Sequence, residues 1–215
     1  MDKQIQLPGR VCMSIFLVNS DCDKNNILEY YLKVLKRNFQ VMSLNSDEIS
    51  ENISFNLMKN HFDPLTGLIW EPRLDDFKCV VSINSFQDGW VGFMEGLSDH
   101  FKFTLLHVSF AKLNSDYEPY SKFIFHNASF TRIIYAISDR GKWDFFQKGE
   151  LQNFENQEYY SRKKIKNRLN SEILVNYLQN IGVDIMKKSF WHSDKSGYYF
   201  QALTSQTFLE KDFLK

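Results

Sequence analysis

Proline and glycine are scarce in this chain, with four prolines and nine glycines among 215 residues. A flexible tether between domains is usually rich in glycine, serine or proline, and no stretch of that composition occurs. Internal repeats and low-complexity tracts are also missing. We therefore expect a single domain over residues 1–215, with a division near 1–101 and 102–215 as the alternative.

The chain also lacks a net charge, because 26 basic residues balance 26 acidic ones. No global field that would recruit nucleic acid or an anionic membrane is therefore expected. The opening segment MDKQIQLPGR has no apolar stretch typical of a signal peptide, and the run VCMSIFLV at 11–18 is too short to span a bilayer. Three cysteines without a CxxC pair fit a reducing compartment. These absences predict a cytoplasmic protein without membrane contact.

Apolar material is plentiful, with 43% hydrophobic and 16% aromatic residues, enough for a sizeable core. Continuous apolar runs at 11–18 and 77–83 predict buried strands. Helical periodicity from Ile27 to Phe39, followed by a short strand in QVMSL, predicts a βαβ-like opening. A further helix is expected over 47–63, and the segment GLIWEPRLDDF at 67–77 reads as irregular.

The second half of the chain has a different texture. Short alternating runs separated by turn residues predict an antiparallel meander over 102–147, with a hairpin at Arg140-Gly141. Helices are expected over 157–169 and after Asn170 or Ser171, the latter ending at Gly182. Strands near 183–191 and 198–204 would complete the fold. The predicted class is α+β, with a mixed, largely antiparallel sheet and helices packed on it.

Three glycines, Gly89, Gly92 and Gly96, interrupt the helical stretch SINSFQDGWVGFMEGLSDHF at 82–101. A phosphate loop places glycines before a helix, with GxGxxG or GK[ST] spacing, and neither pattern is present. Asp88 also stands at the mouth of the helix, where it would repel a phosphate. The spacing favours a smooth face for close packing on the sheet. Close approach of a partner is the alternative, and a phosphate site is the least favoured.

Two constellations could carry catalysis. Glu95, Asp99 and His100 at the end of the same helix offer carboxylates and an imidazole for a metal or for proton transfer, but a solvated helix face is the favoured interpretation. Cys79 could meet His107 on a neighbouring strand, but its apolar run predicts a buried, inert thiol. There is no HxxxH motif and no GxSxG elbow. We therefore predict no catalytic residue and no cofactor.

A basic run, SRKKIKNR, follows Tyr159 and Tyr160. Cations beside aromatic rings suit single-stranded nucleic acid or an acidic protein partner, whereas a solvated helical face is the plain alternative. Glu155 and Glu158 upstream partly neutralise the run, which makes nucleic acid the less favoured partner. The cations of the run are Arg162, Lys163, Lys164, Lys166 and Arg168.

Three stretches resemble a group of small bacterial cytosolic proteins: INSFQDGWVGFMEGLSDHFKF at 83–103, YAISDRGKWDFFQKGELQNFENQEYYSRKKIKNRL at 135–169 and NSEILVNYLQNIGVDI at 170–185. The group includes immunity proteins of contact-dependent and other polymorphic toxin systems. The resemblance implies a small α+β protein that neutralises one toxin domain by binding it, and it carries over no catalytic residue. Structural roles stay open too, since Glu155 could pair with Arg162 or Arg168 inside the fold. The group-typical positions are Asp88, Gly89, Trp90, Trp143, Phe145, Gly149, Phe154, Glu155, Tyr159, Tyr160, Arg162 and Arg168.

Taken together, these patterns predict a non-enzymatic inhibitor that binds a protein partner such as a toxin domain. A small metal-dependent hydrolase using Glu95, Asp99 and His100, and a nucleic-acid binder using residues 159–168, are the alternatives. Tryptophan, tyrosine and arginine are the usual anchors of protein interfaces. The predicted partner-binding residues are Asp88, Trp90, Trp143, Tyr159, Tyr160, Arg162, Lys163, Lys166 and Arg168.

Overall fold

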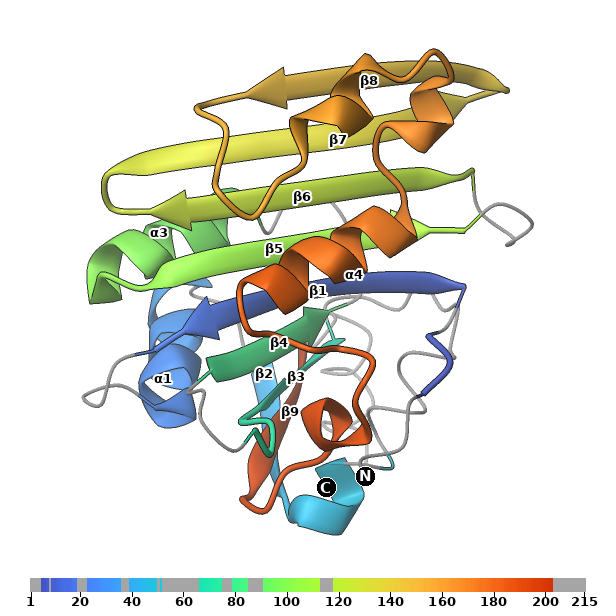
Figure 1. Ribbon diagram of the computed structural model, residues 1–215. Coiled ribbons are helices and arrows are strands. Elements are labelled where there is room, and N and C mark those ends of the chain that lie inside the picture. Colours follow the sequence, from blue (N-terminus) through green and yellow to red (C-terminus); the bar gives the residue numbers. More distant parts are fainter. Residues whose placement is uncertain are drawn as a thin grey trace.

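The computed structural model describes residues 5–7, 9–18, 23–35, 39–49, 51, 66–74, 79–84, 91–112 and 118–202 (Figure 1). The strands are β1 (Arg10–Leu17), β2 (Phe39–Leu44), β3 (Thr66–Trp70), β4 (Cys79–Asn84), β5 (Thr104–Ala111), β6 (Tyr120–Asn127), β7 (Phe130–Asp139), β8 (Lys142–Lys148) and β9 (Gly197–Ala202). The α-helices are α1 (Lys24–Leu35), α3 (Val91–Phe101) and α4 (Ser171–Asn180), and the 3₁₀ turns are η1 (Gln157–Ser161), η2 (Ile165–Asn167) and η3 (Lys188–Trp191).

All nine described strands form one sheet, in the order β2-β9-β3-β4-β1-β5-β6-β7-β8. Each described pairing is antiparallel, so the predicted α+β class with a largely antiparallel sheet is confirmed. In the sequence, α1 lies between β1 and β2. Four successive antiparallel pairings lead from β1 to β2 across the sheet, so these two strands run in the same direction. The strand–helix–strand opening therefore exists, with three strands inserted into it.

The meander β5–β8 follows the predicted strands closely because its turns are specified locally. Arg140 and Gly141 have φ values of 49° and 81°, the left-handed conformations that a two-residue type I′ hairpin requires. At the β6–β7 turn, the Asn127 side chain accepts hydrogen bonds from the backbone N–H groups of Ser129 and Phe130. Both turns join strands in the register that buries one face of the meander.

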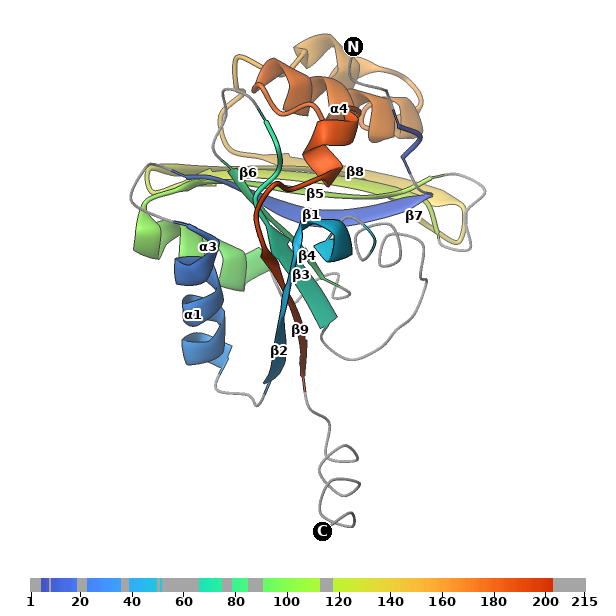
Figure 2. The same ribbon diagram turned by 90° about the horizontal axis from the view of Figure 1, so that it is seen from below.

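Helices cover both faces of the sheet. In Figure 2, α4 and the three 3₁₀ turns lie on one side of the sheet, and α1 and α3 lie on the other. Each side has its own apolar core. Side chains such as Phe123, Leu174 and Phe190 fill the α4 side, whereas Tyr31, Met94 and Phe103 fill the side of α1 and α3.

The ends of α4 match the sequence signals. The Asn170 side chain accepts a hydrogen bond from the backbone N–H of Ile173 at 3.0 Å and so begins the helix. Gly182 has a φ of 96° just beyond the helix, in the left-handed region that ends helices. The predicted helix after Asn170 is therefore confirmed, together with strands β1, β2, β4 and β9.

Four expectations were wrong, only partly right or only partly within the described residues. The segment at 67–77 was expected to be irregular, but its first part belongs to β3, paired with β4 and β9. The helix expected over 157–169 is two short 3₁₀ turns, and the strand expected near 183–191 is an irregular segment ending in η3. Of the helix expected over 47–63, residues 47–49 and 51 are helical and the other positions lie outside the described residues.

Candidate partner-binding surface

A buried ion pair anchors the segment that leads into the basic run. Arg132 on β7 donates from Nε to Glu155 Oε1 at 2.9 Å and from Nη2 to Glu155 Oε2 at 2.8 Å. The two side chains are only 3% and 0% exposed. Nη1 of Arg132 also donates to the Gly149 carbonyl and Nη2 to Gln147 Oε1, so the guanidinium is surrounded by acceptors. The pair clamps residues 149–155 onto the sheet.

Two tyrosines extend this pair into the core. Tyr160 donates its hydroxyl hydrogen to Glu155 Oε2, and its oxygen lies 2.8 Å from the hydroxyl oxygen of Tyr177 on α4. Burial, together with hydrogen bonds to Glu155 and Tyr177, raises the pKa of Tyr160 above its usual value. Burial alone would lower the pKa of Arg132, but the hydrogen bonds and charge of Glu155 outweigh it and the net shift is upward. The phenol thus stays protonated and the guanidinium stays charged.

This network corrects two predictions. Tyr160 is 7% exposed and belongs to the apolar core on the α4 side, so its predicted role in partner binding is wrong. Glu155 does pair inside the fold, but with Arg132 and not with Arg162 or Arg168. One signal in the sequence could have found Arg132. In the alternation of β7 it shares a face with Ile134 and Ala136, which are buried.

The basic run itself forms a compact turn. Arg162 Nη1 donates to the Asn167 carbonyl at 2.9 Å, and Arg168 Nε donates to the Arg162 carbonyl at 2.8 Å. The Arg162 guanidinium lies over the Tyr159 ring at 4.1 Å, and that of Arg168 lies over the Phe145 ring at 5.4 Å. Arginine side chains close the turn from both ends, in place of the helical hydrogen bonds that the sequence predicted.

Four of these cations are exposed: Arg162, Lys163, Lys164 and Lys166, which together we call the basic loop. Among the described residues, none of the four forms an ion pair. The neutralisation expected from Glu155 is absent because that carboxylate is buried against Arg132. Glu158 is the nearest exposed acid in the sequence. The surface is therefore more positive than the sequence indicated.

The remaining predicted partner-binding residues are distributed differently. Trp143 is half-buried on β8 and packs partly against the core on the α4 side. Tyr159 and Arg168 are also half-buried, and both are held in cation–ring contacts. Asp88 and Trp90 lie outside the described residues. The structure thus brings Tyr159, Arg162, Lys163, Lys166 and Arg168 together in one turn.

The alternative metal site does not assemble. Asp99 Oδ1 lies 3.1 Å from Nε2 of His126 on β6, whereas the His100 ring packs against Tyr30 and Phe101. Glu95 completes no set of ligands with them, since no three His, Cys, Asp or Glu side chains of the described residues are grouped to hold a metal ion. The alternative of a metal-dependent hydrolase using Glu95, Asp99 and His100 therefore has no assembled site among the described residues.

The disfavoured pairing of Cys79 with His107 lacks neighbouring strands, because β1 lies between β4 and β5 and Cys79 aligns with Leu17. His107 instead aligns with Ser14, whose Oγ lies 3.1 Å from its Nδ1. The nucleophilic pair loses its geometric basis.

The glycine stretch behaves differently from the prediction of close packing. Gly92 is exposed on α3, and a Cβ added there would meet no atom within 4 Å. A Cβ at Gly96 would lie 3.6 Å from Tyr30 Oη, an ordinary contact with α1 and not with the sheet. The buried face of α3 is formed by Met94, Leu97 and Ser98. Close packing of the glycines on the sheet is therefore wrong for Gly92, and Gly89 lies outside the described residues.

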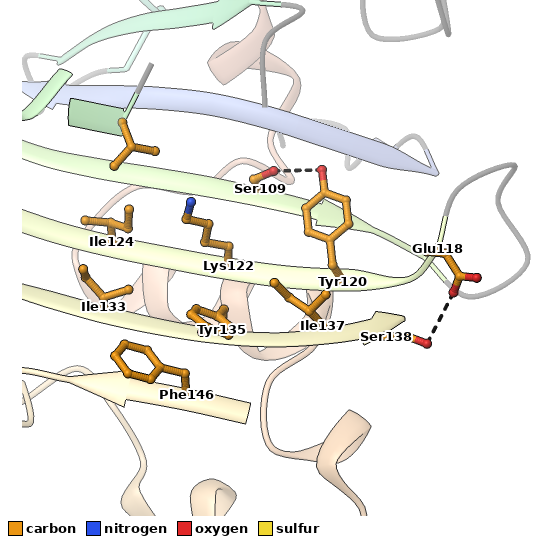
Figure 3. Close-up of a pocket in the computed structure, with 11 residues that line it drawn as sticks. Ser109, Glu118, Tyr120, Lys122, Ile124, Ile133, Tyr135, Ile137, Ser138 and Phe146 are labelled. Atoms are coloured by element: carbon orange, nitrogen blue, oxygen red, sulfur yellow. Dashed lines mark hydrogen bonds between the residues drawn. The ribbon is translucent and has the colours of Figure 1, made fainter. Parts of the chain in front are cut away.

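A groove of about 670 Å³, not expected from the sequence, lies on the same face of the sheet as α3 (Figure 3). Its floor is a row of side chains aligned across four strands, Ser109, Lys122, Tyr135 and Phe146. The Tyr135 and Phe146 rings stack at 5.0 Å. Ile137 and Phe146 are 38% and 39% exposed, so the outer part of this floor is an apolar surface in contact with solvent.

Comparisons with known proteins identify no relative. No protein-family model, no curated protein and no solved structure matches the chain. Of the helices in the described part of the chain, none has the length and apolar character needed to cross a membrane.

Proposed function

We propose that this protein is a non-enzymatic binding protein that inhibits an acidic partner domain through the basic loop. The observation that carries the proposal is the loop itself, in which four exposed cations without an ion pair among the described residues lie on a turn tied to a buried network. The resemblance of residues 83–185 to immunity proteins supports a toxin domain as the partner. The proposal places the complex in the cytoplasm.

The geometry suits electrostatic recognition. Arg162 is already ordered by the Asn167 carbonyl and by the Tyr159 ring, so less side-chain entropy is lost when it binds a carboxylate. Lys163, Lys164 and Lys166 add mobile, solvated charges around it. Such an arrangement steers an acidic partner during diffusional encounter and fixes its orientation. A loop of this kind needs no catalytic group.

Nucleic acid is the weaker candidate, because of the two tyrosines that bases would stack on one is buried and the other has its ring covered by an arginine. Tyr160 is in the core and the Tyr159 ring is covered by the Arg162 guanidinium. Single-strand binders combine a basic groove with exposed aromatic rings. Binding of a labelled oligonucleotide with an affinity that falls steeply as salt rises would reverse this preference.

The test is capture of the partner from the native host by the full chain, compared with two charge-reversed variants. In the first, Lys163, Lys164 and Lys166 are replaced by glutamate. In the matched control, the exposed Lys187 and Lys188 receive the same substitution. We expect one acidic protein to be captured in a one-to-one complex by the unsubstituted chain and the control, and to be lost with the loop variant. Equal capture by both variants would show that the basic loop is not the interface.

A further inference from the structure

Strand β8 forms one edge of the sheet, and its side chains carry a regular charge pattern. Only β7 pairs with it among the described strands. Lys142, Asp144, Phe146 and Lys148 alternate along the strand and share the face of the groove, and all four are exposed. Glu150, also exposed, follows two residues after the strand.

The hairpin fixes which backbone groups of β8 point away from the sheet. Asp139 and Lys142 flank the two-residue turn, and the closing pair of such a turn exchanges hydrogen bonds. Hydrogen-bonded pairs recur at every second residue from Lys142 onward, so the backbone groups of Phe146 bond to β7. The N–H and C=O groups of Phe145 and Gln147 therefore point outward. The outward N–H of Phe145 donates to Asp144 Oδ1 at 2.9 Å. Unpaired edge groups of this kind are a template for another strand.

When a second copy of β8 is laid antiparallel to the first with the two Phe146 residues opposite each other, its charges are complementary to those of the first copy. This arrangement places Asp144 opposite Lys148, with Phe146 facing its own copy. Two-fold symmetry forms the contact between Asp144 and Lys148 twice, and the Phe146 pair lies on the axis. Opposite charges facing each other across an antiparallel pair stabilise it, and aromatic pairs do the same.

We propose that β8 pairs antiparallel with β8 of a second copy of this chain, centred on Phe146. Phe145 and Gln147 would then exchange backbone hydrogen bonds with the second copy, and Asp144 would leave the Phe145 N–H to meet Lys148. The sheet would continue from one copy into the other. The exposed apolar floor formed by Tyr135, Ile137 and Phe146 would become continuous across the two-fold axis (Figure 3).

Other registers are disfavoured by the same charges. Centring the pair on Phe145 would place Lys142 opposite Lys148 twice, and centring it on Asp144 would place that aspartate opposite itself. Both arrangements oppose like charges across the strands. A register shifted by one residue would align Phe145, whose backbone groups point outward, with Phe146, whose backbone groups already bond to β7, so no ladder of hydrogen bonds would form. The pairing is independent of the basic loop, which none of these contacts uses.

Charge reversal tests the pairing in solution by sedimentation equilibrium at chain concentrations up to about 1 mM. Asp144→Lys and Lys148→Glu each turn two attractive contacts into repulsive ones, so each should weaken the dimer about tenfold. The double variant restores complementarity and should restore the dimer. Mixing the two single variants should give a heterodimer stronger than either homodimer. A monomer at every concentration, or a dimer that ignores these changes, overturns the proposal.

Disulfide capture tests the register. In a non-hydrogen-bonded antiparallel pair the Cα atoms lie about 4.5 Å apart, within the range that a disulfide spans. Phe146→Cys should therefore cross-link under mild oxidation. Asp144→Cys should not, since its symmetry mate would lie about 14 Å away along the strands. The unsubstituted chain measures any background from Cys12, Cys22 and Cys79. Cross-linking of the Asp144 variant at an equal rate, or of neither variant above background, contradicts the register.

Discussion

Arg132 and Glu155 form an ion pair whose side chains are 3% and 0% exposed, although 23 positions separate them in the sequence. The pair ties the segment after β8 to β7, and Tyr160 adds a third group to the same carboxylate. Because the basic loop begins two residues after Tyr160, the position of its charges depends on a contact in the interior.

Removal of the Glu155 charge should be costly. Glu155→Gln leaves the Arg132 guanidinium buried without its counter-ion, and breaking one partner of a buried pair lowers the free energy of unfolding by about 3–5 kcal/mol. Urea unfolding measures the loss. Glu158→Gln, an exposed carboxylate three residues on, is the control and should change stability by less than about 0.5 kcal/mol. Equal stability of the two variants would show that the pair contributes little.

The buried His107 predicts a specific pH dependence. Burial, with a smaller contribution from the charge of Lys122, lowers the pKa of His107 from 6.5 to about 3. Above pH 6.5 the imidazole is neutral in both states, so it has no effect there. As the pH falls below 6.5 only the unfolded chain takes up the proton. The free energy of unfolding should then fall by about 1.4 kcal/mol per pH unit on account of this residue.

The variant His107→Asn isolates that contribution. Asparagine retains a polar partner for Ser14 Oγ, which lies 3.1 Å from His107 Nδ1, but it does not titrate. Denaturant unfolding of both proteins between about pH 7 and about pH 4 gives the difference in slope. If the difference in the free energy of unfolding between the two proteins stays constant with pH, His107 takes up its proton in the folded protein as readily as in the unfolded chain.

Two glycines should respond oppositely to alanine. Gly92→Ala adds a methyl group in open space on helix α3 and should raise the free energy of unfolding by about 0.5–1 kcal/mol. Gly67→Ala in β3 places its Cβ 2.2 Å from the Phe200 ring on β9, so the ring or the strands must move. That variant should lose about 1–3 kcal/mol. Thermal or urea unfolding compares them, and destabilisation by Gly92→Ala would show that something covers that face.

The β7–β8 hairpin can be tuned at its turn. Arg140 adopts a φ of 49°, which costs an ordinary residue more than it costs asparagine. Arg140→Asn should raise the free energy of unfolding by a few tenths of a kcal/mol, roughly, because Asn-Gly is the preferred type I′ pair. Gly141→Val, at a φ of 81°, should lower it by about 1–2 kcal/mol. The reverse order of stabilities in urea would contradict the turn type.

The proposed complex should depend on salt. Exposed cations attract an acidic partner over roughly 8 Å at physiological ionic strength, and this attraction is screened as salt rises. Stopped-flow measurements should show an association rate that falls with ionic strength. The fall should be shallower for the variant with glutamate at Lys163, Lys164 and Lys166 than for the Lys187 and Lys188 control. Parallel salt curves for the two variants would contradict a role of the loop in steering.

The parts of the fold that the sequence predicted are those whose signals are local. The apolar run of β1, the turn at Arg140-Gly141 and the cap at Asn170 each depend on a few adjacent residues. Strand β3 escaped prediction because Gly67 and the following Glu71-Pro72 resemble a loop, and its place depends on Phe200 at the far end of the chain. Val183 and Ile185 are buried but do not form a strand. Their apolar side chains indicated burial correctly and a strand wrongly.

The sequence predicted the charge of the candidate surface but not the conformation of the loop that carries it. Five cations in seven residues indicated a charged face, whereas the closing hydrogen bonds from Arg162 and Arg168 to carbonyls have no sequence signal. Tyr160 looked like Tyr159 in the sequence, and its contacts with Glu155 and Tyr177, both distant from any local signal, distinguish the buried ring from the half-buried one. The neutralising role assigned to Glu155 failed for the same reason, because its partner is 23 residues away.

The place of β9 has a consequence for synthesis on the ribosome. This strand, at Gly197–Ala202, lies between β2 and β3 and is the only described neighbour of β2. A growing chain can assemble the meander early, but β2 has no described strand to pair with until residues 197–202 have emerged. Pairing of β2 therefore waits for the strand that is synthesised after all the other described strands, and a message truncated before residue 197 would leave β2 without this neighbour.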